Sequence, residues 1–214
     1  MTATLLIVAA VVALGDWAAV YLRLFRIEYI LKPLVLALLV AVAATADLGA
    51  AKPWVVAALV LGLLGDIGLM LSRDGRTDPP FVLGLGAFLI GHLCYIIAFA
   101  RVGLNGLELV AGLLVVAGVA GLTLPQVLRG AARSAGRPFA YVVAGYAAVL
   151  SAMTVLAVGT GIVVTAIGGV LFLVSDTAIA RERFVERLPY GSVVVIVTYH
   201  LAQFLILIGL IRSF

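Results

Sequence analysis

Three aspartates stand within apolar stretches of this sequence, and each lies seven residues ahead of an arginine. The pairs are Asp16 and Arg23, Asp66 and Arg73, and Asp176 and Arg183. An ionised carboxylate is costly in apolar surroundings, so such groups face a protein interior or a wet cavity and take partners there. A carboxyl group kept from water, or held beside a second carboxylate, can retain a proton at neutral pH and act as a general acid. The pattern therefore predicts acid–base chemistry within an apolar protein.

Asp66 and Asp176 are the strongest catalytic candidates, because a longer pattern repeats around them. The first segment reads LLGDIGLMLSR and the second, 110 residues later, reads FLVSDTAIARER. His92 follows Asp66 by 26 residues, and His200 follows Asp176 by 24. A small residue precedes each aspartate and would let a ligand or another backbone approach. The alternative is a structural role, in which a buried aspartate pairs with a lysine or joins a polar helix contact.

Further polar side chains in the apolar stretches could bind a substrate beside the aspartates: Lys32, His92, Tyr95, Tyr199, His200 and Gln203. Lys32 precedes Pro33, which fits the first turn of a helix, and its ammonium would then lie at the level of the carboxylates. The Lys32 side chain could instead snorkel to the membrane interface. Each histidine could simply join two helices by a hydrogen bond. Two histidines and some aspartates could also bind a metal, but no closely spaced ligand pair occurs, so neither a metal site nor a cofactor is predicted.

The composition indicates that membrane helices position these residues. Hydrophobic residues make up 65% of the chain and charged residues only 11%, and the mean hydropathy is +1.29, far from the composition of soluble domains. Apolar stretches of about 18 residues or more recur, each long enough to cross a bilayer core as a helix. We therefore predict an all-α membrane protein, with residues 1–214 as a single transmembrane domain.

Seven breaks rich in proline, glycine and charge divide the chain into eight predicted transmembrane helices. The breaks fall at residues 23–28, 47–53, 73–80, 101–106, 129–137, 159–161 and 181–190. The spans run approximately over residues 2–22, 29–46, 53–72, 81–100, 106–128, 138–158, 161–180 and 191–211. Because the spans with Asp66 and Asp176 run in the same direction, the repeat predicts a bundle of two parallel four-helix halves. Each of these aspartates lies about 10 Å from the arginine at its helix end, so we also predict that both face one interior cavity open toward the basic side.

Positive charge is strongly asymmetric across these breaks, and it is usually retained on the cytoplasmic side. Alternate connections hold 11 of the 14 basic residues, namely Arg23, Arg26, Lys32, Arg73, Arg76, Arg129, Arg133, Arg137, Arg181, Arg183 and Arg187. We predict a multi-pass protein of the cytoplasmic membrane, with both ends of the chain outside the cytoplasm. Anionic membrane lipids then account for the net charge of +4, and no nucleic-acid partner is expected.

Six segments, in order, cover residues 29 to 206: YILKPL (29–34), GLLGDIGLML (62–71), LGLGAFLIGHLCYIIAF (83–99), GYAAVLSAM (145–153), GGVLFLVSDTAIARERF (168–184) and TYHLAQFLI (198–206). In these segments the sequence resembles the lysoplasmalogenase, or YhhN-like, family of membrane proteins. His200 departs from the pattern, since family members more often have tyrosine there. The resemblance therefore gives His200 no catalytic role of its own.

The resemblance implies hydrolysis of the vinyl ether bond of a lysophospholipid, the lysoplasmalogen, to a fatty aldehyde and a glycerophospho-ethanolamine or glycerophospho-choline. Such bonds hydrolyse when the β-carbon is protonated and water captures the resulting oxocarbenium ion. Asp66 and Asp176 would then be the acid and the base, in either order. Lys32 would bind phosphate or tune the two carboxyl groups. Water or the glycerol hydroxyl would be oriented by Tyr95, Tyr199 and Gln203.

Two other classes of protein remain open from the sequence. Aspartates and histidines inside a membrane, together with parallel repeats, also occur in proton-coupled transporters of small or lipid-like substrates. A structural helix bundle could use the same residues for polar contacts only. Release of a free fatty aldehyde would distinguish a hydrolase from both.

Overall fold

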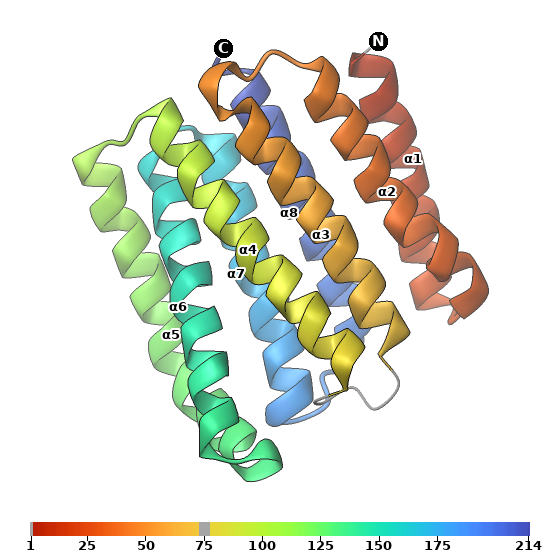
Figure 1. Ribbon diagram of the computed structural model, residues 1–214, viewed down its shortest axis with the longest axis vertical. Helices are drawn as coiled ribbons and strands as arrows, with labels where there is room; N and C mark the ends of the chain where they lie inside the picture. The colour runs from red at the N-terminus through yellow and green to blue at the C-terminus, as the bar shows by residue number, and fades with distance from the viewer. Residues whose placement is uncertain (1, 73–77) are drawn as a thin grey trace.

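The computed structural model describes residues 2–72 and 78–214, which form eight long α-helices packed in an up-and-down bundle (Figure 1). In chain order the helices are α1 (Thr2–Tyr21), α2 (Phe25–Thr45), α3 (Lys52–Leu71), α4 (Pro79–Val102), α5 (Gly106–Ala135), α6 (Arg137–Gly159), α7 (Val163–Phe184) and α8 (Gly191–Ile211). A short 3-10 helix, η1 (Gly49–Ala51), leads into α3. No strand occurs among the described residues.

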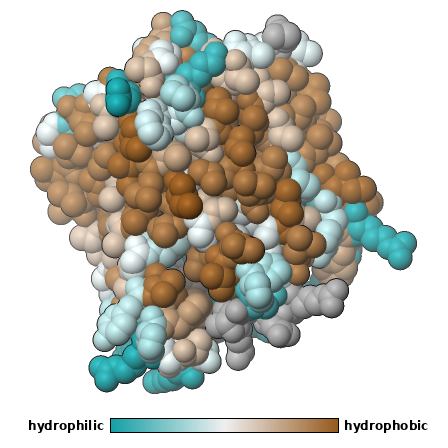
Figure 2. Space-filling model, in the orientation of Figure 1, coloured by the Kyte–Doolittle hydropathy of each residue, from teal (hydrophilic) through white to brown (hydrophobic). Residues whose placement is uncertain are grey.

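Each of the eight helices is long and apolar enough to cross a membrane. Figure 2 shows a broad apolar region across the middle of the visible face, with hydrophilic atoms gathered toward its top and bottom. A lipid bilayer requires this distribution, because its hydrocarbon core offers no partners to polar groups. The protein is therefore a multi-pass integral membrane protein, and the prediction of eight spans is confirmed.

Two predicted details near the basic ends of the helices are corrected by the structure. The break predicted at residues 129–137 is present but narrower than expected, because α5 continues to Ala135 and only Gly136 separates it from α6. Arginine favours helices, so the helix can continue where it leaves the membrane, and Gly136, with φ of +85°, permits the reversal. Pro33 is not in a first turn, since α2 already begins at Phe25.

Helix contacts repeat between the two halves of the chain. Helix α3 lies along α4 as α7 lies along α8, and α1 pairs with α2 as α5 pairs with α6. The halves meet where α4 contacts α6 and where α8 contacts α2, as a parallel repeat would give. The repeat is imperfect, because α1 packs on α8 whereas α5 packs on α7.

Two of the arginines counted in the charge prediction, Arg73 and Arg76, lie outside the described residues.

The helices differ in how deeply they are buried. Helix α8 has the largest buried share, with buried residues from Gly191 to Leu210. Helix α5 has the smallest and lies at one edge of the bundle in Figure 1. The polar residues of α8 are thus enclosed by other helices, whereas α5 presents most of its surface to lipid.

Candidate active site

Lys32 and Asp66 form an ion pair between α2 and α3. The Lys32 Nζ lies 3.2 Å from Oδ1 of Asp66, and the two side chains are 14% and 2% exposed. Nearby, the Tyr29 hydroxyl donates a hydrogen bond of 2.5 Å to the Met70 carbonyl and ties the same two helices together. The ammonium offsets a buried negative charge that would otherwise be very costly. The prediction that Lys32 lies within reach of one of the aspartates is confirmed.

Asp176 on α7 has a different set of partners. Its Oδ2 accepts a hydrogen bond of 2.5 Å from the Tyr146 hydroxyl of α6, and the same oxygen lies 4.0 Å from Nε2 of His92 on α4. The imidazole of His92 meets the rings of Tyr146 and Phe172 edge-on, at centroid distances of 5.5 and 4.7 Å. Three helices therefore converge on this carboxyl group.

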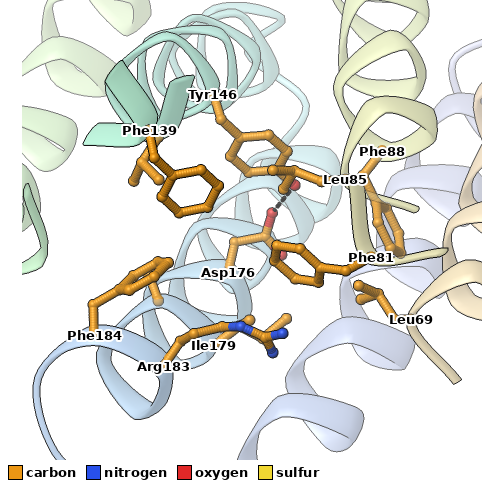
Figure 3. A pocket seen from close by; sticks show the side chains of 12 residues that line it. Leu69, Phe81, Leu85, Phe88, Phe139, Tyr146, Asp176, Ile179, Arg183 and Phe184 are labelled. Atoms are coloured by element: carbon orange, nitrogen blue, oxygen red, sulfur yellow. Dashed lines mark hydrogen bonds between the residues drawn. The ribbon is translucent and has the colours of Figure 1, made fainter. Parts of the chain in front are cut away.

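An apolar pocket opens beside Asp176 between α4, α6 and α7 (Figure 3). Figure 3 shows Asp176 and Arg183 on one wall, Phe81 and Phe88 of α4 facing them, and Tyr146 with its hydrogen bond to the carboxylate. About 600 Å³ of the pocket is free of atoms, part of it open to the outside. Its largely apolar lining suits an apolar ligand with few polar contacts.

Asp66 does not line this pocket, so the pocket is not the single cavity that the sequence predicted for both aspartates. The Phe88 ring, which lines the pocket, packs on Gly65, the residue before Asp66. Asp66 is nevertheless close enough to Asp176 for their charges to interact. The two carboxyl groups therefore belong to one polar region, but Asp66 pairs with Lys32, whereas Asp176 contacts Tyr146 and His92.

Tyr199 on α8 lies in the middle of this region. Its ring meets Phe88 and Phe172 edge-on, at centroid distances of 5.8 and 5.5 Å. The hydroxyl faces Asp66 and Gln203, but it makes no well-aligned hydrogen bond to a described residue. A buried hydroxyl in this state can still bond to water or substrate.

Gln203 and Tyr95 form a second buried contact near Tyr199. The Tyr95 hydroxyl donates to Oε1 of Gln203 at 2.5 Å. Gly62 leaves the space for these groups, because a Cβ there would lie 3.2 Å from both Nε2 of Gln203 and the Tyr199 hydroxyl. His92 lines the same narrow gap as Gly62, Tyr95 and Gln203. Tyr95, Tyr199 and Gln203 are thus brought together near Asp66.

His200 lies on another side of α8. Its Nδ1 accepts a hydrogen bond of 3.1 Å from Nε1 of Trp17, so it joins α8 to α1. This contact is the helix-to-helix hydrogen bond that the sequence left as an alternative, and it lies apart from the groups that contact Asp176.

Among the residues that the structure describes, no group of three or more His, Cys, Asp or Glu side chains could hold a metal ion.

Asp16, the third aspartate, is completely buried on α1. Neither of its carboxylate oxygens has a hydrogen-bond partner among the described residues. Its charge interacts with those of Lys32, Glu28 and Asp66. Asp16 is thus part of the environment of the Lys32–Asp66 ion pair, although it does not line the pocket beside Asp176.

Comparison with known proteins places this arrangement in a family. Residues 27–210 match the YhhN family. The chain belongs to the YhhN family. All the polar residues predicted for the site fall within the matched range, which also includes Tyr146.

Curated relatives share most of this matched region. The chain is 32% identical over 174 residues to "Lysoplasmalogenase TMEM86A" of Bos taurus, covering 72% of this chain and 64% of the relative. It is 33% identical over 157 residues to "Lysoplasmalogenase TMEM86B" of Homo sapiens, covering 73% of this chain and 62% of the relative. The chain thus spans slightly less than two thirds of these relatives. No solved structure matches it.

Sequence reasoning missed Tyr146 as a member of the site. Tyr146 lies nine residues after Arg137, so its depth resembles that of Asp176, seven residues before Arg183. That similarity of depth was an available signal. Tyrosine near a membrane surface is nevertheless common for reasons unrelated to catalysis, so depth alone could not select it.

Proposed function

We propose that this chain is a membrane-embedded hydrolase that cleaves the vinyl ether bond of lysoplasmalogens, giving a fatty aldehyde and a glycerophospho-ethanolamine or glycerophospho-choline. Membership of the YhhN family and the lysoplasmalogenase relatives support this activity. The structural observation that carries it is a carboxyl group, Asp176, at an apolar pocket with a tyrosine and a histidine beside it. The relatives are named as lysoplasmalogenases, which does not favour a transporter.

Asp176 is the proposed general acid, because it lines the pocket in which an alkenyl chain would lie. Its proton moves to the β-carbon of the vinyl ether, and the electron pair of the double bond forms the new C–H bond. The positive charge develops on the α-carbon and the ether oxygen. The carboxylate left on Asp176 then stabilises that cation, and the hydrogen bond from Tyr146 holds this carboxylate in place.

Water then completes the reaction. It adds to the α-carbon and gives up a proton to His92 or to the Asp176 carboxylate, which lie 4.0 Å apart. The resulting hemiacetal breaks its bond to the glycerol oxygen, which takes back the proton that the water gave up and leaves as an alcohol. The hemiacetal hydroxyl passes its own proton to Asp176, and the carbonyl of the aldehyde forms. One water is consumed, and the side chains return to their starting protonation.

Asp66 and Lys32 act on this reaction through their charges. Their ion pair provides a fixed dipole behind the pocket, and Asp66 adds negative charge that favours the oxocarbenium ion. In this mechanism Tyr199 and Gln203 hold the water: the Tyr199 ring packs on Phe88 of the pocket wall, and its hydroxyl faces Asp66 and Gln203. These steps use side chains and water alone, so we expect chelators to leave activity unchanged.

Purified protein in lipid nanodiscs, incubated with a panel of alkenyl, acyl and saturated alkyl lysophospholipids, tests the proposal. We expect free fatty aldehyde from the alkenyl substrates alone, detected by mass spectrometry. Turnover should be slower in deuterium oxide, because proton transfer to carbon is the proposed slow step. No aldehyde release in nanodiscs, together with movement of unchanged lysolipid across the membrane of sealed proteoliposomes, would instead identify a carrier and refute the hydrolase.

A further inference from the structure

A second apolar pocket reaches the same carboxyl group from the other side of α6. It lies between α5, α6 and α7, whereas the first lies between α4, α6 and α7. Asp176 and Tyr146 line both pockets, as do Val143 and Ala180. A ligand bound through both pockets would therefore pass directly beside the Tyr146–Asp176 hydrogen bond.

The first pocket extends from Asp176 toward the basic end of the bundle. Its far end is lined by Phe81, Arg183 and Phe184, and the Arg183 guanidinium carbon lies 3.9 Å from the centre of the Phe81 ring. Arg183 is seven residues after Asp176 on α7, or about 10 Å along the helix axis. The pocket thus has a carboxyl group at one end and a guanidinium at the other, with apolar walls between them.

The second pocket reaches deeper toward the middle of the bilayer than the first, although Thr177 and Ala180, on the basic side of Asp176, also line it. Its deeper residues include Val119 of α5, Leu150 and Ser151 of α6, and Leu173 of α7. Leu173 precedes Asp176 by almost one helical turn, on the side away from Arg183. Helix α5, which forms one wall, is the least buried helix of the bundle. A hydrocarbon chain could therefore enter this pocket sideways from the lipid.

We propose that a lysophospholipid binds across both pockets, with its phosphate at Arg183, its vinyl ether at Asp176 and its hydrocarbon chain between α5, α6 and α7. This arrangement rests on the function proposed above and adds which end of the substrate lies in which pocket. In this arrangement Arg183 recognises the phosphate. Ala147, in the wall of the second pocket, limits the space for the hydrocarbon chain of the substrate.

The dimensions of the substrate fit this arrangement. Seven bonds separate the β-carbon of the vinyl ether from the phosphorus, and an extended zigzag of that length spans roughly 9 Å. The axial separation of Asp176 and Arg183 is about 10 Å. A phosphate at the level of the head groups then leaves the hydrocarbon chain pointing toward the bilayer centre, in the orientation of the surrounding lipids. Guanidinium groups bind phosphate oxygens through paired hydrogen bonds.

Binding of uncleavable saturated alkyl analogues tests the phosphate end independently of turnover. The probes are hexadecyl-glycerophosphoethanolamine and hexadecylglycerol, which lacks the phosphate, measured by native mass spectrometry in nanodiscs. Arg183→Gln should weaken binding of the first by at least about tenfold, as for loss of one charge-assisted hydrogen bond, and leave the second within twofold. The control is Arg181→Gln, since Arg181 pairs with Glu186 and does not line the pocket. Equal weakening of both probes, or of both variants, would overturn the assignment of the phosphate.

The chain end is tested with hexadecyl and hexyl analogues that carry the same head group. Ala147→Phe fills the second pocket, so the preference for the longer chain should fall at least about tenfold, because each buried methylene adds to binding. Ala148→Phe is the control, since Ala148 is exposed and does not line the pocket. An unchanged chain-length preference in Ala147→Phe would overturn the placement of the chain.

The two proposals can fail separately. If the wild-type protein releases no aldehyde but the analogues bind as described, the hydrolase is refuted and the two-pocket lipid site stands. If aldehyde is released but neither Arg183→Gln nor Ala147→Phe alters analogue binding selectively, the hydrolase stands and the arrangement of the substrate is refuted.

Discussion

The Tyr146 hydroxyl lies 2.5 Å from Oδ2 of Asp176, and this hydrogen bond joins α6 to α7 in the wall that two apolar pockets share. A tyrosine hydroxyl is a neutral donor that can remain in place while the carboxyl group gives up and regains a proton. The contact therefore suits a group that changes charge during each turnover.

Tyr146→Phe should lower turnover of a lysoplasmalogen by at least about tenfold, because hydrogen bonds to charged groups contribute about 1.5–3 kcal/mol. The phenylalanine ring keeps the edge-on contact with His92, so the thermal midpoint should change by only a few degrees. Tyr141→Phe, at an exposed position on the same helix, is the matched control. Wild-type turnover by Tyr146→Phe would remove this residue from the mechanism.

Asp66→Asn and Asp176→Asn should each lower turnover by at least about a hundredfold. That is the low end for loss of a positioned acid, in Asp176, and for loss of a group that stabilises the developing charge, in Asp66. Asparagine keeps the shape of the side chain but cannot supply the proton or the negative charge. Aldehyde release should be measured beside Asp47→Asn, which replaces an exposed aspartate of the α2–α3 connection. Activity of both site variants near the wild-type level would exclude the two-aspartate mechanism.

Lys32→Met should destabilise the protein by about 3–5 kcal/mol, because it leaves the Asp66 charge buried without its cation. Adding Asp66→Asn should restore much of that stability, since the uncompensated charge is then removed as well. Unfolding of both variants in the same detergent provides the comparison. If the double variant is no more stable than Lys32→Met, the ion pair is not the source of the loss.

Trp17→Phe should remove the hydrogen bond to His200 and cost about 1 kcal/mol of stability, while turnover stays within about twofold. The same replacement in a His200→Phe background should have a smaller effect, because the partner is already missing. A large loss of turnover in Trp17→Phe would show that this hydrogen bond supports catalysis in addition to holding α1 against α8.

The charge asymmetry predicts that the basic ends of the helices face the cytoplasm. Figure 1 shows both ends of the chain at one end of the bundle, opposite the Gly136 turn, so they should lie on the other side of the membrane. Reporter fusions after Phe214 and at Gly136 should give opposite signals. A cytoplasmic reporter signal from the Phe214 fusion would reverse the orientation.

Much of the fold could be predicted because a bilayer limits the choices. The length of each apolar stretch and the alternation of charge were sufficient to find eight spans, since the hydrocarbon core requires helices of that length. The Lys32–Asp66 ion pair was predictable for a related reason. Two opposite charges at one depth, each costly alone, are strongly driven to meet.

The lateral arrangement of the helices was much less accessible from the sequence. Depth follows from counting residues along a helix, but the neighbours of a helix depend on packing between segments far apart in the chain. The Tyr146–Asp176 contact and the position of Phe88 against Gly65 both depend on such packing. For the same reason, the sequence suggested one cavity for both aspartates, whereas only Asp176 lines the pocket.

The deep burial of α8 has a consequence for how the protein is made. Of the eight described helices, α8 is the last to leave the ribosome, yet it has the largest buried share. Until it inserts, the other seven helices lack the residues that face Asp66 and join α1, namely Tyr199 and His200. Assembly of the bundle must therefore finish after synthesis of α1 to α7 is complete. A nascent chain halted before α8 would present unsatisfied polar groups within the bilayer, a feature by which membrane quality control could recognise it.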